Sequence, residues 1–287
     1  MSLLALSLIL LASFVHASWN LATKRIGGAV PLAWLMSALN LVIYAGPVAY
    51  YSWRWRPEIS PMGWFFMAGT GLIHLWYGLA LQKGYRVGDL SLVYPLARGT
   101  GPLFTVIGAI VLFGERPSWI ALGGIALIIG GIVLITLRRH HSADPERIHL
   151  GRFYGLLTGA LIAVYTLWDK HAVSVLKVPP LLLDYSNAVI GVTLLAPMAW
   201  RGRAEVARHW REHPKELAVI SVFRPLSYIL ILTALTFTPV SVVAPAREIS
   251  ILIGVFLGSR IFDEEGLQQR LAASVLMLLG IVAIAFG

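Results

Sequence analysis

The chain has 287 residues, of which 57% are hydrophobic and only 13% are charged, and its mean hydropathy is +0.76. Soluble domains carry about a quarter of charged residues, so this composition excludes an ordinary soluble protein and favours a helical membrane protein. A β-barrel is excluded because its spans would be short and alternating. The net charge of +9 comes from Lys and Arg in the joints between apolar blocks, a placement typical of membrane orientation rather than of nucleic-acid binding.

Apolar blocks of about 20 residues follow one another along the chain, and each is predicted to be a transmembrane helix. The first lacks a basic segment before it and a small-residue cleavage site after it, so we interpret it as a retained span. The basic joint at 201–215 is predicted to form an amphipathic helix on the membrane surface. The ten predicted spans are 3–23, 31–53, 61–82, 89–113, 118–137, 153–175, 180–200, 215–236, 241–262 and 267–286.

An internal repeat relates the two halves of the chain. The segment "SLVYPLAR" at 91–98 resembles "SVVAPARE" at 241–248, which lies 150 residues further on. The same shift, or one of 149, also pairs Pro47 with Pro197, Glu115 with Glu265, Trp19 with Trp168 and Asn20 with Asp169. Because each half holds an odd number of spans, residues 1–140 and 141–287 are expected to enter the membrane from opposite sides. The predicted fold is an all-α membrane protein with ten transmembrane helices, arranged as two inverted five-helix repeats.

Polar and ionisable side chains recur inside six of the predicted spans. Such residues are costly in a bilayer and generally face a cavity or a partner helix. Several of them stand three or four positions apart and therefore share one helical face. Since these faces lie in both halves at related depths, we expect a single central polar cavity that binds substrate. The candidate residues are His16, Trp19, Asn20, His74, Tyr77, Tyr94, Arg98, Tyr165, Trp168, Asp169, Arg224, Tyr228, Arg247 and Glu248.

Several of these candidates also have a purely structural interpretation. The alternatives are interfacial anchoring by Trp19 and Trp168, packing roles for His16 and His74, an Arg98–Glu248 bridge between the halves, and neutralisation of Asp169 by Lys170. The glycines of "GGIALIIGG" at 123–131 are interpreted as close helix packing.

The sequence contains none of the motifs of common catalytic sites. It has no Ser-His-Asp order, no paired-carboxylate motif and no phosphate loop. It also has no cysteine, which rules out disulfides and thiolate metal sites. We therefore predict neither an enzyme nor a cofactor or metal. The expected partners are a small-molecule metabolite, the lipid bilayer, and a coupling proton or counter-substrate, with no nucleic acid.

Residues 80–135 resemble the EamA-type repeat of the drug/metabolite transporter superfamily, and the resemblance extends over essentially the whole chain. The resemblance is carried by Pro95, by Gly114-Glu115-Arg116 and by Gly123-Gly124. The second copy keeps Pro245 and Glu265 but reads "FDEEGLQQR" where the first reads "FGERPSWIA". The resemblance implies a helix broken at its proline and a substrate cavity between the halves, lined by the first, third and fourth helices and their counterparts.

The residues at the expected cavity indicate the charge of the substrate. Small multidrug members of the superfamily bind cations through a glutamate on the first helix, where this chain has His16, Trp19 and Asn20. The candidate set instead offers three arginines, a side chain suited to carboxylate and phosphonate groups. We predict a secondary transporter of a small anionic or zwitterionic organic metabolite, amino acid-like or organophosphonate-like, that works by alternating access. A channel-like or lipid-translocating protein that uses the same groove is the alternative.

The location follows from the spans, whereas the orientation stays open. A multi-pass chain of this kind belongs in the cell membrane, which would be the inner membrane of a bacterium. The basic joints place both termini outside the cytoplasm by the positive-inside rule. The family resemblance implies that both termini lie inside.

Overall fold

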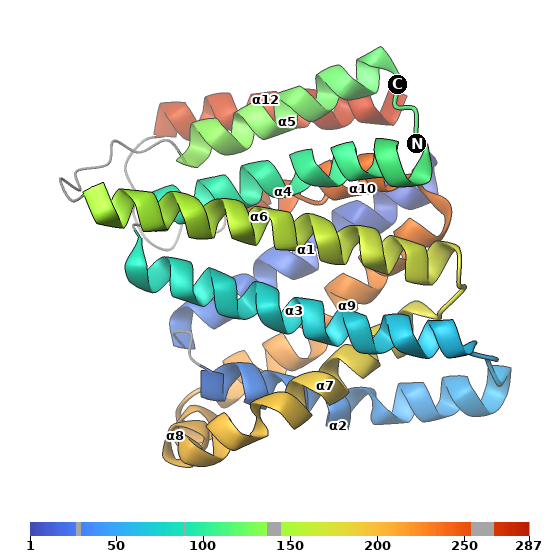
Figure 1. Ribbon diagram of the computed structural model, residues 1–287, viewed down its shortest axis with the longest axis vertical. Coiled ribbons are helices and arrows are strands. Elements are labelled where there is room, and N and C mark those ends of the chain that lie inside the picture. The colour runs from blue at the N-terminus through green and yellow to red at the C-terminus, as the bar shows by residue number, and fades with distance from the viewer. Residues whose placement is uncertain (27–29, 89, 137–144, 254–266, 287) are drawn as a thin grey trace.

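The computed structural model describes residues 1–26, 30–88, 90–136, 145–253 and 267–286. In these ranges the chain forms eleven helices and no strand (Figure 1). Seven of the helices are long and apolar enough to cross a membrane, and two shorter helices are also apolar, so the chain is a multi-pass helical membrane protein. The helices are α1 (Leu3–Ile26), α2 (Val30–Trp55), α3 (Pro61–Val87), α4 (Leu90–Phe113), α5 (Trp119–Thr136), α6 (Pro145–Ser174), α7 (Pro180–Arg201), α8 (Arg203–Glu212), α9 (Pro214–Phe237), α10 (Val240–Ala246) and α12 (Leu267–Phe286).

The number of helices differs from the predicted ten. One additional helix is α8, which occupies the basic joint and confirms the predicted amphipathic segment at 201–215. The ninth predicted span begins as the seven-residue helix α10. The predicted position of Glu265, and much of the ninth span, lies outside the described residues.

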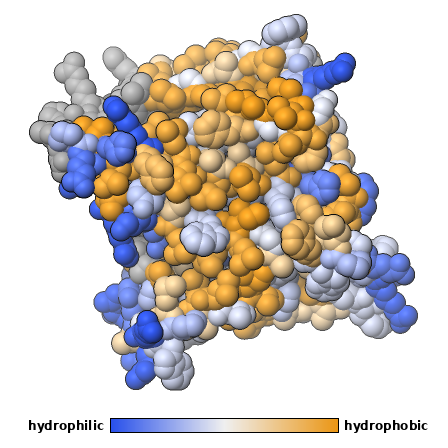
Figure 2. Space-filling view, viewed as in Figure 1, coloured by the Kyte–Doolittle hydropathy of each residue, from blue (hydrophilic) through white to orange (hydrophobic). Residues whose placement is uncertain are grey.

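The surface of the molecule shows an apolar band between two polar ends. The long helices run side by side in Figure 1, and both termini lie at the same end. In Figure 2 hydrophobic residues cover the middle of this face, while hydrophilic residues gather towards the helix ends. Tryptophans near the helix ends are exposed, for example Trp53 at 70% and Trp200 at 72%. This pattern is typical of a protein whose sides contact lipid and whose aromatic side chains lie at the membrane interfaces.

The helices pack in pairs that join the two parts of the chain. Helix α2 packs against α7, α5 against α12, α1 against α9, and both α3 and α4 against α6. The α5–α12 contact is close because a Cβ atom added to Gly124 would lie 2.6 Å from the Gly280 carbonyl oxygen. The predicted close packing of the glycine-rich segment 123–131 is thereby confirmed.

The helix break that the family resemblance implied at Pro95 is wrong. Helix α4 continues through this position from Leu90 to Phe113. A proline removes one backbone donor, and α4 accommodates that loss within helical geometry. The interruption lies instead in the second copy, where α10 ends at Ala246 and the chain turns through Arg247 and Glu248 before helical geometry resumes at 249–253. Hydrogen bonds in this turn span three residues, as in Glu248 N–H to the Pro245 carbonyl at 3.0 Å.

Two charged side chains hold the turn between α9 and α10. The carboxylate of Glu115 accepts hydrogen bonds from the backbone N–H groups of Val240 (2.8 Å) and Ser241 (2.9 Å), at the start of α10. The ammonium group of Lys170 donates to the carbonyls of Leu235 (2.8 Å) and Thr238 (2.9 Å), at the end of α9. Both side chains therefore satisfy backbone groups that a helix terminus leaves free. The interpretation that Lys170 neutralises Asp169 is wrong, because its ammonium binds these carbonyls.

Replacing Glu115 by glutamine is expected to destabilise this junction. A glutamine has a single acceptor oxygen, so one of the two backbone N–H groups would lose its partner at a cost of about 1–3 kcal/mol. We expect a lower unfolding temperature in detergent, measured by intrinsic tryptophan fluorescence. The exposed Glu58 offers a matched control, because Glu58→Gln should leave that temperature unchanged. Equal unfolding temperatures for Glu115→Gln and the parent protein would contradict the capping role.

Candidate functional site

The structure brings all but two of the candidate residues together in the middle of the helix bundle. We call this group the central polar cluster. Its side chains come from α1, α3, α4, α6 and α9 and from the turn after α10. The central polar cluster comprises His16, Trp19, His74, Tyr77, Tyr94, Arg98, Tyr165, Asp169, Arg224, Tyr228, Arg247 and Glu248.

Glu248 is the centre of the most highly charged contact in the cluster. Its carboxylate lies 3.2 Å from Nη1 of Arg98 and 3.4 Å from Nε of Arg247. The carboxylate is 1% exposed, whereas the two arginine side chains keep 16% and 15% of their areas exposed. The Arg98–Glu248 bridge is thus present, and it joins two residues that are 150 positions apart. Both arginines retain surface beyond their shared carboxylate, so they could also contact a bound anion.

Tyrosine and histidine rings connect this ion pair to helix α3. The guanidinium of Arg247 donates to the hydroxyl of Tyr165 at 2.9 Å. The Tyr165 ring meets the His74 ring edge to face, with 4.3 Å between centroids, and lies 5.4 Å from the ring of Tyr77. On the other side of the ion pair, the guanidinium of Arg98 lies 5.8 Å from the ring of Tyr94. Aromatic faces of this kind also attract ligand cations.

Asp169 is buried among neutral hydroxyl groups. It is 1% exposed. Its Oδ1 accepts a hydrogen bond from Thr70 at 2.7 Å, and its Oδ2 accepts one from the hydroxyl of Tyr228 at 2.5 Å. Nε2 of His74 lies 3.6 Å from the same Oδ2. This carboxylate therefore joins α6 to both α3 and α9.

Arg224 differs from the other arginines of the cluster in having no direct partner. Over the part of the chain that the structure describes, its guanidinium makes no hydrogen bond and no ion pair. The carboxylate that acts on its charge is that of Asp184, which lies beyond ion-pair distance. A guanidinium carries five N–H donors, and an unpaired charge in a membrane protein interior is costly. Arg224 is therefore the cation of the cluster that is most available to an anionic ligand.

The two tryptophan candidates both form hydrogen bonds to a neighbouring helix. Nε1 of Trp19 donates to the hydroxyl of Ser227 on α9 at 3.2 Å, and the Trp19 ring meets that of His16 edge to face at 4.9 Å. Nε1 of Trp168 donates to the carbonyl of Phe66 on α3 at 2.8 Å. Trp168 stacks on the Phe66 ring, with 4.0 Å between centroids. It thus lies against α3 and outside the central polar cluster.

Asn20 is the second candidate that the structure leaves apart. It is exposed near the end of α1 and makes no hydrogen bond to any residue that the structure describes. The predicted repeat pairs Asn20 with Asp169, yet Asp169 is buried in the cluster. The two halves are therefore chemically different at this pair of positions.

Sequence reasoning missed a third buried carboxylate on α7. Asp184 is 4% exposed and accepts a hydrogen bond from the amide of Asn40, itself 2% exposed, at 3.1 Å. The rule that an ionisable residue within a span marks a functional region could have found it. Two neutral polar residues, Thr70 and Asn187, were missed as well. With Asp184 included, three arginines face three carboxylates, and the formal charge of the region is zero when all of them are ionised.

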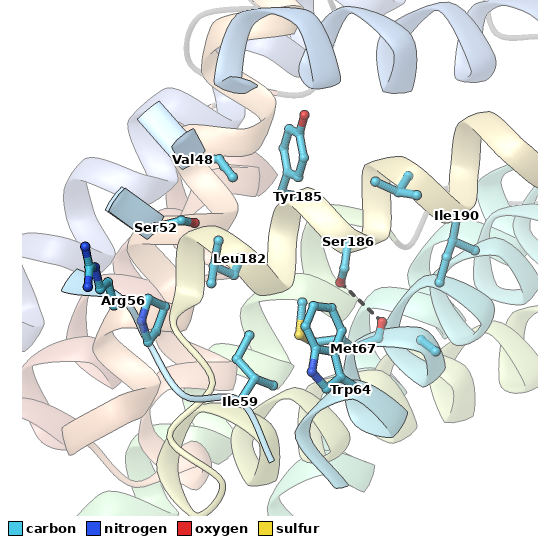
Figure 3. Close-up of a pocket in the computed structure, with 13 residues that line it drawn as sticks. Val48, Ser52, Arg56, Ile59, Trp64, Met67, Leu182, Tyr185, Ser186 and Ile190 are labelled. Carbon is cyan, nitrogen blue, oxygen red and sulfur yellow. Dashed lines mark hydrogen bonds between the residues drawn. The ribbon is translucent and has the colours of Figure 1, made fainter. Parts of the chain in front are cut away.

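An open groove lies at the side of the bundle, between α2, α3 and α7 (Figure 3). It has a volume of about 640 Å³, and most of its lining is apolar, including Leu182, Val189 and Ile190. The hydroxyl of Ser186 faces α3 there and donates to the Met67 carbonyl at 3.3 Å. None of the candidate residues lines this groove. This groove is therefore not the expected polar cavity, and the candidate side chains contact one another in the centre of the bundle.

Comparison with known proteins identifies the family. The model of the EamA-like transporter family matches this chain twice, at residues 3–137 and 149–286. The chain therefore belongs to the EamA-like transporter family, which confirms the resemblance drawn from residues 80–135. As a member, it is a multi-pass membrane transporter, with a small molecule as its expected cargo.

One relative and one solved structure add to this assignment. The chain is 31% identical over 67 residues to multidrug resistance protein EbrB of Bacillus subtilis (strain 168), which covers 23% of this chain and 57% of that protein. The match therefore spans little more than half of that relative. A solved crystal structure aligns with 98% of this chain and 96% of its own, with a TM-score of 0.73 at 16% identity. At this identity the likeness establishes the fold alone.

Proposed function

We propose that the chain is a secondary transporter that moves a small zwitterionic or anionic organic metabolite by alternating access. The observation that carries the proposal is Arg224, a partly buried arginine of the central polar cluster with no direct partner among the described residues. A carboxylate or phosphonate group would satisfy its planar array of donors in a bidentate manner. Amino acids and organophosphonates both carry such a group.

A zwitterion fits the remaining charges better than a simple anion. The three arginines are balanced formally by three carboxylates, so the cluster has no large excess of either sign. The rings of His74, Tyr165 and Tyr228 lie together on the α3, α6 and α9 faces, with His74 4.3 Å from Tyr165 and 5.2 Å from Tyr228. An ammonium group can bind against such rings while Arg224 holds the acidic group.

The proposed architecture is ten transmembrane helices in two inverted five-helix repeats, 1–140 and 141–287. Seven helices of membrane length, the shorter apolar helices α5 and α12, and a ninth span that begins with α10 would make up the ten. A pseudo-two-fold axis would pair each helix of one half with its counterpart in the other, as in α2–α7 and α5–α12. It would also make the contact of α1 with α9 equivalent to that of α6 with α3, and both contacts are present. The double match of one family model also supports the repeat.

In this architecture the site lies at the seam between two similar halves. Such halves can rock against each other, which opens the site to one side of the membrane and then to the other. The turn at Arg247 and Glu248 interrupts the ninth span beside the ion pair with Arg98. A change in this contact would therefore accompany the change of state.

A ligand-stabilisation screen tests the proposed substrate class. Purified protein in detergent is heated with amino acids, phosphonates, sugar phosphates or polyamines, and unfolding is followed by tryptophan fluorescence. A ligand that binds only the folded state at 100 times its Kd adds about 2.7 kcal/mol of stability. We expect amino acids or phosphonates to raise the unfolding temperature. Stabilisation by polyamines alone would overturn the proposed charge preference.

Counterflow in proteoliposomes tests the transport mechanism. A carrier gives saturable uptake of the stabilising compound that is accelerated by the same compound inside the vesicle. Flux that rises linearly with concentration, with no acceleration by internal compound, would favour the channel-like or lipid-translocating alternative.

A further inference from the structure

The three buried carboxylates of the bundle have different surroundings. Glu248 lies between two arginines, so its negative charge is compensated directly. Asp184 receives a hydrogen bond from the Asn40 amide. Among the described residues, Asp169 accepts hydrogen bonds from two neutral hydroxyl groups and has no arginine or lysine within ion-pair distance. It differs from Asp184 in having an imidazole nitrogen 3.6 Å from its carboxylate, with which it could share a proton.

The hydrogen bonds of His74 orient this ring towards Asp169. The amide nitrogen of Asn187 on α7 lies 3.0 Å from Nδ1 of His74 and donates to it. Because Nδ1 accepts, the neutral ring carries its hydrogen on Nε2. That nitrogen lies 3.6 Å from Oδ2 of Asp169 and has no hydrogen-bond partner in the described structure. A small approach of α3 to α6 would close the Asp169–His74 hydrogen bond.

No arginine or lysine nitrogen of the described residues lies within ion-pair distance of Asp169. Lys170, the next residue, is bound to the carbonyls at the end of α9. The titratable and charged groups that face Asp169 and His74 from the helices packed around them are His74 and Tyr77 on α3, Arg98 on α4, Tyr165 on α6, Asp184 on α7, Arg224 and Tyr228 on α9, and Arg247 and Glu248 after α10.

An ionised Asp169 beside a neutral His74 would be a buried carboxylate with no cation in direct contact among the described residues. Such a carboxylate is unfavourable in a membrane protein interior, even where more distant arginines balance its formal charge. One additional proton, held either on the carboxylate of Asp169 or on the imidazole of His74, would remove this cost. In both forms the pair is neutral overall.

We propose that Asp169 and His74 together bind one exchangeable proton and form the site of the coupling ion. The proton would enter the pair from one side of the membrane and leave it to the other in each transport cycle, with no net consumption. Tyr228, which contacts both Asp169 and the His74 ring, lies on the same helix as Arg224. Loss of the proton would therefore alter the contacts of the helix that carries the proposed substrate arginine. The coupling role depends on the proposed transport function, whereas proton binding does not.

Infrared titration of purified protein in nanodiscs tests the proton site without any substrate. We expect a carboxylic-acid carbonyl band that titrates with pH in the parent protein and is absent from Asp169→Asn. The exposed Glu58→Gln variant is the control and should keep the band. His74→Gln leaves Asp169 in place and is expected to shift the midpoint of the band's titration by more than one pH unit. This second variant decides the matter if Asp169→Asn does not fold.

An unchanged band in Asp169→Asn would overturn the proposal, and so would an unchanged midpoint in His74→Gln. Either result would leave the transport function untouched, since the measurement involves no substrate. Conversely, the proton site can be present even if the ligand screen and counterflow fail.

Coupling is tested in proteoliposomes with the amino acid or phosphonate that gives the largest stabilisation. We expect Asp169→Asn to lose at least tenfold in accumulation driven by an imposed pH gradient, a much larger loss than in its counterflow, which needs no net proton movement. Accumulation equal to that of the parent protein would overturn the coupling role. An equally large loss of counterflow would also overturn it, because Asp169 would then be required for substrate binding itself.

Discussion

Replacing Arg224 by alanine is expected to reduce the affinity for a zwitterionic or anionic ligand by about 10- to 100-fold. Hydrogen bonds to charged groups contribute about 1.5–3 kcal/mol, and every 1.4 kcal/mol is a factor of ten in affinity. The protein without ligand should unfold at the same or a higher temperature, because the substitution removes a charge that has no direct partner. The measurement is the unfolding temperature by tryptophan fluorescence, with and without the ligand found in the screen.

Two further variants sharpen this experiment. Arg224→Lys keeps the positive charge but lacks the planar pair of donors, so we expect an affinity between those of the parent and of Arg224→Ala. Arg208→Ala removes an arginine of α8 whose side chain is 57% exposed, and it should leave ligand binding unchanged. Undiminished stabilisation of Arg224→Ala by the ligand would show that Arg224 does not hold the substrate.

The class of fold follows from the sequence because the bilayer imposes a simple requirement. A span must be helical and about 20 residues long to satisfy its backbone in hydrocarbon. The apolar blocks therefore predicted a helical membrane protein, and the charged joint at 201–215 predicted α8. The position of the helix break was not predictable from local sequence, since Pro95 and Pro245 occur in similar segments. The copy that turns is the one whose Arg247 and Glu248 bind Tyr165 and Arg98.

The candidate site was predictable only where helical spacing identifies one face. His74 and Tyr77 stand three positions apart and both join the cluster. Spacing does not reveal what a face packs against, so it did not separate Trp168, which stacks on Phe66, from its neighbour Asp169.

Asp184 was missed for a reason that lies in the repeat. The candidate residues lie on polar helix faces that recur in both halves. At the offset of 150, Asp184 corresponds to Trp34, and its partner Asn40 corresponds to Ile190. A polar pair that is present in just one of the two halves gives no repeat signal. Such asymmetric residues are nevertheless the ones that make two similar halves chemically distinct.

Replacing Glu248 by glutamine is expected to be the most destabilising single change in the cluster. It leaves Arg98 and Arg247 close together without their shared carboxylate, and removing one partner of a buried ion pair costs about 3–5 kcal/mol. The double variant Arg98→Met with Glu248→Gln should recover part of this loss, because replacing both members of a buried pair is often neutral. Unfolding is measured for Arg98→Met, for Glu248→Gln and for the double variant, each against the parent protein. The difference between the double variant and the sum of the single variants gives the coupling energy of the pair.

Function in the double variant then separates the two roles of Arg98. If Arg98 serves only to bridge the halves through Glu248, the double variant should fold and also retain ligand binding and counterflow. If Arg98 also contacts substrate, as the 16% exposed area of its side chain allows, the double variant should regain stability but lose ligand affinity by about tenfold or more. We expect the second result, because a carboxylate that is 1% exposed compensates two guanidinium groups that both keep exposed surface. Additive effects of the two single substitutions on stability would contradict the bridge itself.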